Sequence, residues 1–316
     1  MILLTGASGF VGSALLAALE RGGQAVRPVY RREAPFGALA GVLVPAIDST
    51  TDWESQLGNV ECVVHLAARV HVMRDLAQNP IAEFREVNVG GTLNLARQAA
   101  RRGASRFVYI SSIKVNGEWT SEGSAFRPDD APNPLDPYAI SKCEAEAGLR
   151  RVAAETGMDL VIIRPVLVYG PNVKGNFLSM MRWVHRGVPL PFGALHNLRS
   201  IVGVSNLVDL ILTCLRHPAA ANQTFLVSDG QDLSTPDLLR YTAATMGRGV
   251  CLVAVPEAVL QGGARLIGKH GLAQRLCCSL RVDISKTREL LDWHPPVAFA
   301  QELKSTVECF LAHREE

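Results

Sequence analysis

Short apolar runs recur through the first half of the chain, and stretches with the length and polarity of surface helices follow several of them. A short apolar run rich in Val, Ile and Leu has the length of one buried strand. Strands that alternate with helices predict an α/β fold with a parallel sheet, and we expect a crossover helix after each early strand. The expected strands are Ile2–Leu4, Gln24–Tyr30, Val42–Ile47, Cys62–Leu66 and Arg106–Ile110, and the expected helices include Ser13–Glu20, Pro80–Arg102 and Tyr138–Glu155.

A glycine turn joins the first strand to the first helix. Gly6, Gly9 and Gly12 follow the strand at a spacing of three, in Thr5-Gly-Ala-Ser-Gly-Phe-Val-Gly12. Glycine allows positive φ and lets the backbone approach a pyrophosphate, while the start of the helix offers free N–H groups to phosphate. The run therefore predicts a dinucleotide site. Its expected contacts are Gly6, Ser8, Gly9, Phe10, Val11 and Gly12.

The ends of the next strands extend this site. Arg31 and Arg32 follow the second strand, and no acid occurs until Glu33. An acid there would bond the ribose 2′-hydroxyl of NAD, whereas arginine suits the 2′-phosphate of NADP. We therefore expect NADP, with NAD as the alternative and a solvated basic turn as the simpler interpretation. The third strand ends at Asp48 and Ser49, with Asp48 placed to accept from the adenine amine, and the fourth ends at Leu66, Ala67 and Ala68, which would lie beside the cofactor.

Tyr138 and Lys142 form the second chemical pattern. They stand four residues apart, on one face of the expected helix, and Ser111 and Ser112 end the fifth strand. A nearby ammonium, together with the positive charge of an oxidised nicotinamide, would favour the phenolate of a tyrosine and make it a usable acid or base. A serine hydroxyl can hold the same substrate oxygen. We therefore expect Ser112, Tyr138 and Lys142 to be catalytic and the chain to be an oxidoreductase.

Composition excludes several classes of function. The formal net charge of +2, without a long basic run, argues against nucleic acid as a partner. Seven cysteines without metal-ligand spacing predict reduced thiols in a cytoplasm and no metal site. Residues 1–4 are too short for a signal peptide. The apolar stretch Val250–Gly268 is interrupted by Pro256 and charged residues, so we expect no membrane span.

The chain resembles the extended short-chain dehydrogenase/reductase family, in its branch of nucleotide-sugar epimerases, dehydratases and reductases. The resemblance covers nearly the whole chain and rests on an ordered set of motifs. They are the glycine run, His65-Leu-Ala-Ala68, Glu86-Val-Asn-Val-Gly-Gly-Thr92, Tyr109-Ile-Ser-Ser112, Tyr138-Ala-Ile-Ser-Lys142, Arg164-Pro-Val-Leu-Val-Tyr-Gly-Pro171, Asn176-Phe-Leu178 and Val227-Ser-Asp-Gly-Gln-Asp-Leu-Ser-Thr235.

The resemblance implies a Rossmann-type doubly wound parallel sheet with a smaller mixed substrate-binding lobe. The cofactor domain would comprise residues 1–168 and about 200–228, and the lobe about 169–199 and 229–316. It implies a homodimer through the helices at 80–102 and 138–155. The apolar positions expected to face the partner include Ile81, Phe84, Leu95, Ile140, Ala147 and Leu149. It adds Asn88, Ser111, Pro165 and Val168, with Tyr138 and Lys142, to the cofactor site, and places Lys114, Asn176 and Arg199 near the substrate.

Departures from the family narrow the reaction. Sugar dehydratases carry Asp-Glu after the catalytic hydroxyl, where this chain has Ile113 and Lys114. The run Ser111–Glu118 resembles the 4-keto-6-deoxy nucleotide-sugar reductases of surface polysaccharide (O-antigen) synthesis. We therefore expect a reductase of a 4-keto-6-deoxy sugar, with a UDP handle. A nucleotide-sugar 4-epimerase is the alternative, and an NADP-binding sensor or a reductase of a non-sugar ketone also stays open.

Overall fold

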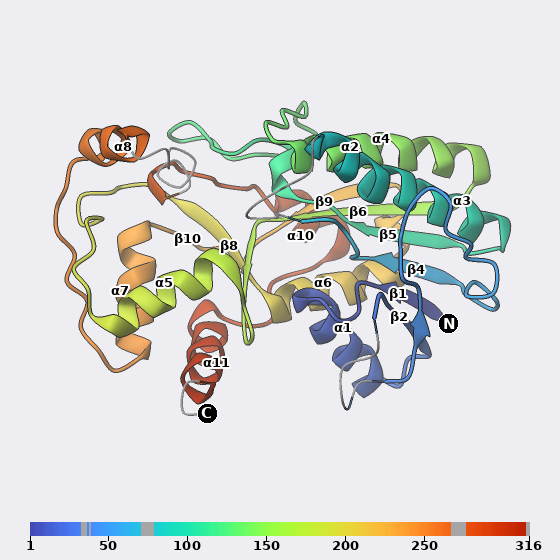
Figure 1. Ribbon diagram of the computed structural model, residues 1–316, viewed down its shortest axis with the longest axis horizontal. Coiled ribbons are helices and arrows are strands. Elements are labelled where there is room, and N and C mark those ends of the chain that lie inside the picture. The colour runs from blue at the N-terminus through green and yellow to red at the C-terminus, as the bar shows by residue number, and fades with distance from the viewer. Residues whose placement is uncertain (33–36, 38, 71–78, 267–275, 314–316) are drawn as a thin grey trace.

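Seven parallel strands form one sheet through the middle of the molecule (Figure 1). The computed structural model describes residues 1–32, 37, 39–70, 79–266 and 276–313. All six strand pairings of this sheet are parallel, which confirms the predicted α/β fold. The strand order is β3-β2-β1-β4-β5-β6-β9, formed by β1 (Ile2–Thr5), β2 (Val26–Tyr30), β3 (Val42–Leu43), β4 (Cys62–His65), β5 (Arg106–Ile110), β6 (Asp159–Pro165) and β9 (Gln223–Val227).

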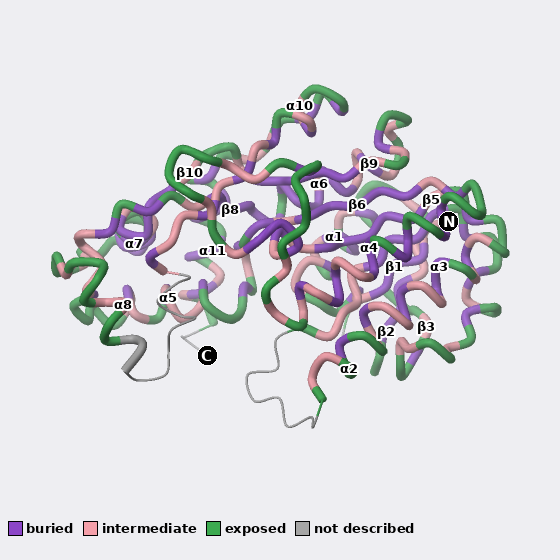
Figure 2. The backbone as a smooth tube through the Cα atoms, turned by 90° about the horizontal axis from the view of Figure 1, so that it is seen from above, coloured by how far each residue is buried: buried purple, intermediate pink, exposed green. Residues whose placement is uncertain are grey.

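Successive residues of each strand point to opposite faces of the sheet, so the sheet has a core on both sides. Leu4, Val64 and Val108 pack with helices α1 (Phe10–Arg21) and α6 (Val204–Arg216). Leu3 and Val63, their neighbours in sequence, pack instead with α3 (Thr92–Arg101) and α4 (Pro137–Thr156). Figure 1 shows these two helix layers on opposite faces of the sheet, and Figure 2 shows that β5 and β6 are buried between them. The sheet is therefore doubly wound.

A second, smaller sheet lies beside the first and has a core of its own. Its order is β10-β8-β7, with β7 parallel and β10 antiparallel to β8. Phe10, at the start of α1, packs against both cores and marks their junction. The proposed domain division at 168, 200 and 228 remains a prediction. This part of the chain contains β7 (Leu167–Tyr169), β8 (Arg199–Gly203), β10 (Asp232–Leu233), α5 (Gly175–Arg186), α7 (Thr235–Thr245), α8 (Glu257–Leu266) and α11 (Phe299–Ala312). Helix α10 (Ser285–Leu291) lies beside β9 and η3 (Pro218–Ala220).

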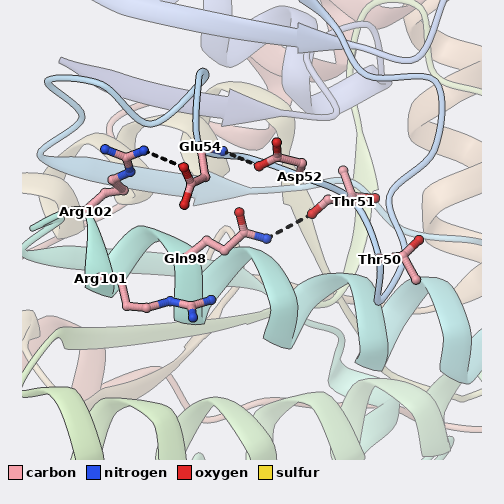
Figure 3. A pocket seen from close by; sticks show the side chains of 7 residues that line it. All are labelled: Thr50, Thr51, Asp52, Glu54, Gln98, Arg101 and Arg102. Atoms are coloured by element: carbon pink, nitrogen blue, oxygen red, sulfur yellow. Dashed lines mark hydrogen bonds and ion pairs between the residues drawn. The ribbon is translucent and has the colours of Figure 1, made fainter.

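The connection after β3, which is described in full, differs from the prediction. The third strand is shorter than Val42–Ile47, because its one partner, β2, ends at Tyr30, whose carbonyl accepts the last bond from the Val44 N–H at 2.8 Å. No helix follows it over residues 44–61, all of which are described. Figure 3 shows a contact that holds this connection: Gln98 of α3 donates to the Thr51 carbonyl at 2.9 Å, in a surface pocket that Arg101 and Arg102 also line. The crossover helix expected after each early strand is therefore wrong here.

One turn of wider helix interrupts the helical stretch that the sequence predicted at 80–102. The stretch is α2 (Pro80–Arg85), then the π-helical η1 (Glu86–Gly91), then α3. Such turns are uncommon and are found at functional positions. Asn88, one of the predicted site residues, lies in this turn and is buried.

Two positions that the sequence assigned to a dimer face belong to the core of the single chain. Leu95 and Leu149 are both buried against the sheet, in the same cluster. A side chain that already packs inside its own chain offers no surface to a second copy, so that part of the expectation is wrong. None of the helices in the described ranges is both long and apolar enough to cross a membrane.

Truncating Leu95 tests this correction. Leu95→Ala should lower the free energy of unfolding by about 2–5 kcal/mol, the usual cost of such a cavity in a core. The sedimentation behaviour should not change. The control is Leu43→Ala, the same truncation at a side chain that is 56% exposed, and it should cost far less. A change of oligomeric state without a loss of stability would contradict the assignment.

Candidate active site

The glycine turn after β1 is packed so closely that side chains have no room. Gly6 has φ of 73°, and a Cβ there would lie 2.8 Å from the amide nitrogen of Ala67. At Gly12 a Cβ would lie 2.0 Å from the carbonyl oxygen of Gly6, so α1 and the turn touch backbone to backbone. The turn is closed by a bond from the Gly9 N–H to the Gly6 carbonyl at 2.9 Å. Only glycine at these positions brings the start of α1 to the end of β1.

This geometry fits a dinucleotide. Gly9 occupies the N-cap of α1 and no side chain caps the helix, so the first N–H groups of α1, including those of Phe10 and Val11, face outward at its positive end. Ser8 is exposed at the turn. The turn lies at the carboxyl ends of β1 and β4, where the strand order reverses and where α/β sheets bind ligands. Leu66, Ala67 and Ala68 follow β4 directly and line the same edge.

The adenine end of the predicted site is only partly defined. Arg31 and Arg32 are exposed immediately after β2, while Glu33 lies outside the described residues. The carboxylate of Asp48 accepts from both Thr50 and Thr51, and these bonds lower its pKa.

Ser49 extends this edge of the sheet toward η1. Its N–H and its hydroxyl both donate to Glu86, at 3.0 and 2.6 Å. These bonds lower the pKa of Glu86. Because Glu86 opens η1, they fix the residues after β3 against the π-helical turn.

The three predicted catalytic side chains come from adjacent elements. Ser112 lies two residues after β5 and accepts, through its hydroxyl, from the N–H of Lys114 in η2 (Ile113–Val115). Tyr138 lies in the first turn of α4, and Lys142 follows one turn later. The Lys142 ammonium donates to the carbonyl of Ile110, the last residue of β5, at 2.8 Å. That bond ties the helix of Tyr138 to the strand end that carries Ser112.

Lys142 is buried in a largely neutral setting. Its Nζ lies 4.4 Å from the centre of the Tyr109 ring and 6.0 Å from that of the Tyr138 ring, distances at which a cation is attracted to a ring face. Burial lowers the pKa of Lys142 to about 7, although Glu146 acts in the opposite direction. The imidazole of His65 forms hydrogen bonds with the hydroxyl groups of Thr5 and Thr92, one at each ring nitrogen. Burial lowers the pKa of His65 to about 3. His65 is thus a neutral packing residue.

The phenol of Tyr138 is protonated in the protein without cofactor. Burial and the negative charge of Asp136 both raise its pKa. The sequence analysis expected Lys142 to lower this pKa, but with its own pKa near neutrality Lys142 carries only part of a charge to do so. A nicotinamide cation in the glycine turn's site would supply the missing positive charge.

Asn88 holds the backbone around Tyr138. Its amide donates to the hydroxyl of Ser141 at 2.9 Å and to the carbonyl of Arg69, whose N–H it accepts in return. The Ser141 hydroxyl donates to the carbonyl of Tyr138 at 2.7 Å. Asn88 therefore reaches Tyr138 through Ser141, which the sequence analysis did not identify.

A buried ion pair underlies the site. Arg164 on β6 donates to both carboxylate oxygens of Glu146 on α4, at 2.9 and 2.6 Å. Glu146 also accepts from the hydroxyl of Ser111 at 2.6 Å, and Arg164 donates to Asn116 at 2.9 Å. The hydroxyl of Ser111 is thus directed into the protein, where it positions the strand end that carries Ser112. Glu146 was also absent from the predicted set.

The remaining predicted residues lie at the edge shared by the two sheets. Pro165 is the last residue of β6, directly after Arg164, and Val168 lies in β7, the next strand. Arg199 begins β8 and donates to the carbonyl of Cys278, while Asn176 is exposed in the first turn of α5. Lys114 contacts two carboxylates, those of Glu118 and Asp136. Their roles toward cofactor or substrate stay predictions.

The chain matches known proteins over most of its length. Residues 2–228 match the model of the NAD dependent epimerase/dehydratase family. The chain belongs to this family. It is 46% identical over 312 residues to a UDP-glucose 4-epimerase of Vibrio cholerae, covering 98% of this chain and 95% of that protein.

Two further matches bear on the fold and on the reaction. A GDP-6-deoxy-D-mannose reductase of Pseudomonas aeruginosa is 27% identical, over 96% of this chain and 95% of that protein. The crystal structure of a UDP-glucuronic acid 4-epimerase from Bacillus cereus in complex with NAD superposes with a TM-score of 0.79 at 20% identity, over 99% of both chains. The predicted family and fold are therefore confirmed, and the family is one that binds a nicotinamide cofactor.

The exposed arginines generate a test of cofactor choice. We expect the protein to bind NADP at least about tenfold more tightly than NAD, since one charge-assisted bond from an arginine to the 2′-phosphate contributes about 1.5–3 kcal/mol. Arg31→Asp should reverse the order in a calorimetric titration. The control is Arg151→Asp, an exposed arginine on α4 far along the helix from Tyr138. Equal affinities in the unmodified protein would contradict the expectation.

The lowered pKa of Lys142 predicts a pH dependence of stability. Between about 7, its pKa in the fold, and its ordinary value of 10.5, the unfolded chain holds a proton that the fold does not. Stability from this group therefore rises with pH across that window. In denaturant unfolding of the ligand-free protein, Lys142→Met should lose this rise. Lys304→Met, at an exposed position, should keep it. Parallel pH profiles for all three proteins would refute the assignment.

Proposed function

We propose that the protein is a nucleotide-sugar 4-epimerase that acts on a UDP-linked hexose with a bound nicotinamide cofactor. The observation that carries the proposal is the 46% identity to the Vibrio cholerae UDP-glucose 4-epimerase, which extends over 98% of this chain. The sequence analysis placed a reductase first and the epimerase second. The comparison favours the second hypothesis, and Ser112, Tyr138 and Lys142 are what either reaction needs.

The residues of the chain suit both halves of an epimerisation. A bound nicotinamide would accept one hydride from C4 and later return it. Tyr138 takes the proton of the C4 hydroxyl and gives it back, while Ser112 holds that oxygen. The bond from Lys142 to the carbonyl of Ile110 holds α4, which carries Tyr138, against the end of β5, which leads to Ser112. Because the hydride returns to the same sugar, the reaction runs with NAD or NADP, and Arg31 and Arg32 favour NADP.

The substrate and its setting follow from the same residues. Asn176 on α5 and Arg199 on β8 are proposed to hold the diphosphate, at the edge between the two sheets. All seven cysteines are free thiols, which suits the cytoplasm that the sequence analysis expects. We retain the homodimer proposal, with surface positions of α2, α3 and α4 other than Leu95 and Leu149 at the contact.

A reductase remains the second candidate on one specific observation. The residues from Ser111 to Glu118 resemble those of 4-keto-6-deoxy nucleotide-sugar reductases, and a GDP-6-deoxy-D-mannose reductase is 27% identical over 96% of this chain. The two functions differ in their use of cofactor, since a reductase consumes one NADPH per product.

Product analysis separates the two candidates. The purified protein should interconvert UDP-glucose and UDP-galactose, followed by NMR of the sugar, without net oxidation or reduction of added cofactor. Consumption of NADPH in step with reduction of a 4-keto-6-deoxy nucleotide sugar, without epimer exchange, would instead establish the reductase.

Removing the phenol oxygen tests the mechanism. Tyr138→Phe should fold and bind cofactor, and its turnover should fall by about 10²–10⁴, the usual contribution of a positioned proton donor. Tyr241→Phe is the matched control, because that tyrosine is exposed on α7. Turnover that survives in Tyr138→Phe would rule out the assigned role.

A further inference from the structure

Lys114 joins the catalytic serine to the helix of the catalytic tyrosine. Its N–H donates to the hydroxyl of Ser112, and its ammonium contacts Asp136, two residues before Tyr138. The same ammonium lies 3.0 Å from the carboxylate of Glu118, four residues further along the chain. The three side chains are only 18–22% exposed, so this group is sheltered from water and its charges are screened less than those of surface pairs.

Asp136 has two tasks that conflict. Its Oδ1 accepts from the N–H of Ala139 at 2.7 Å and so caps the N-terminus of α4, the helix that carries Tyr138 and Lys142. Its negative charge also raises the pKa of the Tyr138 phenol. The carboxylate that caps α4 would therefore, if its charge were not balanced, oppose the loss of the proton from the Tyr138 phenol.

We propose that Lys114 is a positioning residue for Tyr138: its ammonium holds and neutralises Asp136, so that the phenol can give up its proton without facing an unbalanced carboxylate. Glu118 holds the ammonium from its other side and keeps it directed at Asp136. The inference rests on the proposed function, in which Tyr138 must accept a proton when C4 is oxidised. It gives an electrostatic role to Lys114, one of the two residues at which the chain departs from the dehydratase pattern.

The other groups around the phenol do not replace Lys114. On α4 itself, Lys142 has a pKa of about 7 and is only partly charged near neutrality. Tyr109 on β5 and His65 on β4 are both neutral, with pKa values moved by burial in the direction of the uncharged form. Arg69, ahead of α2, stacks on Phe84, whose ring meets the edge of the Tyr138 ring at 6.2 Å, and it pairs with Glu83.

Charge removal and charge repair test the inference. The rate at which the bound nicotinamide is reduced by UDP-glucose, in a single turnover of the cofactor-loaded enzyme, should fall roughly ten- to hundredfold in Lys114→Met, as one uncompensated charge at several ångströms predicts. The KM for the sugar should change less than about twofold. Lys114→Arg should stay within about threefold, and the double variant Lys114→Met, Asp136→Asn should recover most of the lost rate, since asparagine also caps helices.

Lys286→Met provides the matched control. Lys286 forms an ion pair with Asp129, at 3.1 Å, and this pair does not include any of the predicted catalytic residues. It should leave the rate unchanged. A rate in Lys114→Met equal to that of the unmodified protein would overturn the inference. So would a loss that appears only in KM, which would make Lys114 a substrate anchor, or a double variant as slow as the single one.

A second measurement keeps the inference independent of the substrate. The chain has five tyrosines, so the Tyr138 signal of protein labelled at the tyrosine ring carbon can be assigned with Tyr138→Phe. In the cofactor-loaded protein, its NMR titration should move to higher pH in Lys114→Met and return in the double variant. An unmoved titration contradicts the inference. If the unmodified protein converts no UDP-sugar while the titration moves as expected, the proposed function fails and the electrostatic role of Lys114 stands.

Discussion

The ion pair between Glu146 and Arg164 is the contact on which the arrangement of the site depends. It is buried, it joins α4 to β6, and through Ser111 and Asn116 it also holds the residues on either side of Ser112 and η2. Breaking a buried pair by removing one partner costs about 3–5 kcal/mol, because the other charge is left without compensation. Neither residue needs to touch a substrate. Together they set where the strand end and the helix meet, and hence where Ser112 and Tyr138 meet.

Features encoded in short stretches of sequence could be predicted. The glycine run forms a tight turn because Gly6 adopts a positive φ and Gly12 packs directly against the backbone of Gly6. Both requirements involve residues only a few positions apart. The start of α4 was predictable for a similar reason: Asp136 before Pro137 is a typical N-cap followed by proline at the first helical position. The sequence analysis began this helix at Tyr138 and overlooked the cap, Asp136, whose carboxylate raises the pKa of Tyr138.

Features that depend on distant partners could not be predicted from one sequence. Arg164 and Glu146 are 18 residues apart, and Ser49 and Glu86 are 37 apart, so no local spacing indicates either contact. The same limit explains why Leu95 was assigned to a surface: a helical pattern shows that one face is apolar but not what covers it. The low pKa of Lys142 has the same origin, since burial depends on the elements that pack around it.

The π-helical turn at Glu86–Gly91 makes the length of this segment matter as well as its residues. An α-helix has about 3.6 residues per turn, so each residue rotates the helix by about 100°. Losing one residue from η1 would therefore let the backbone close into regular α-helix, and would rotate α2 against α3 by about that angle. Asn88 would swing away from Ser141, and Phe84 away from the Tyr138 ring. Point substitutions in η1 leave this rotation intact, whereas a single deletion removes it, so natural variation in this segment should preserve its residue count.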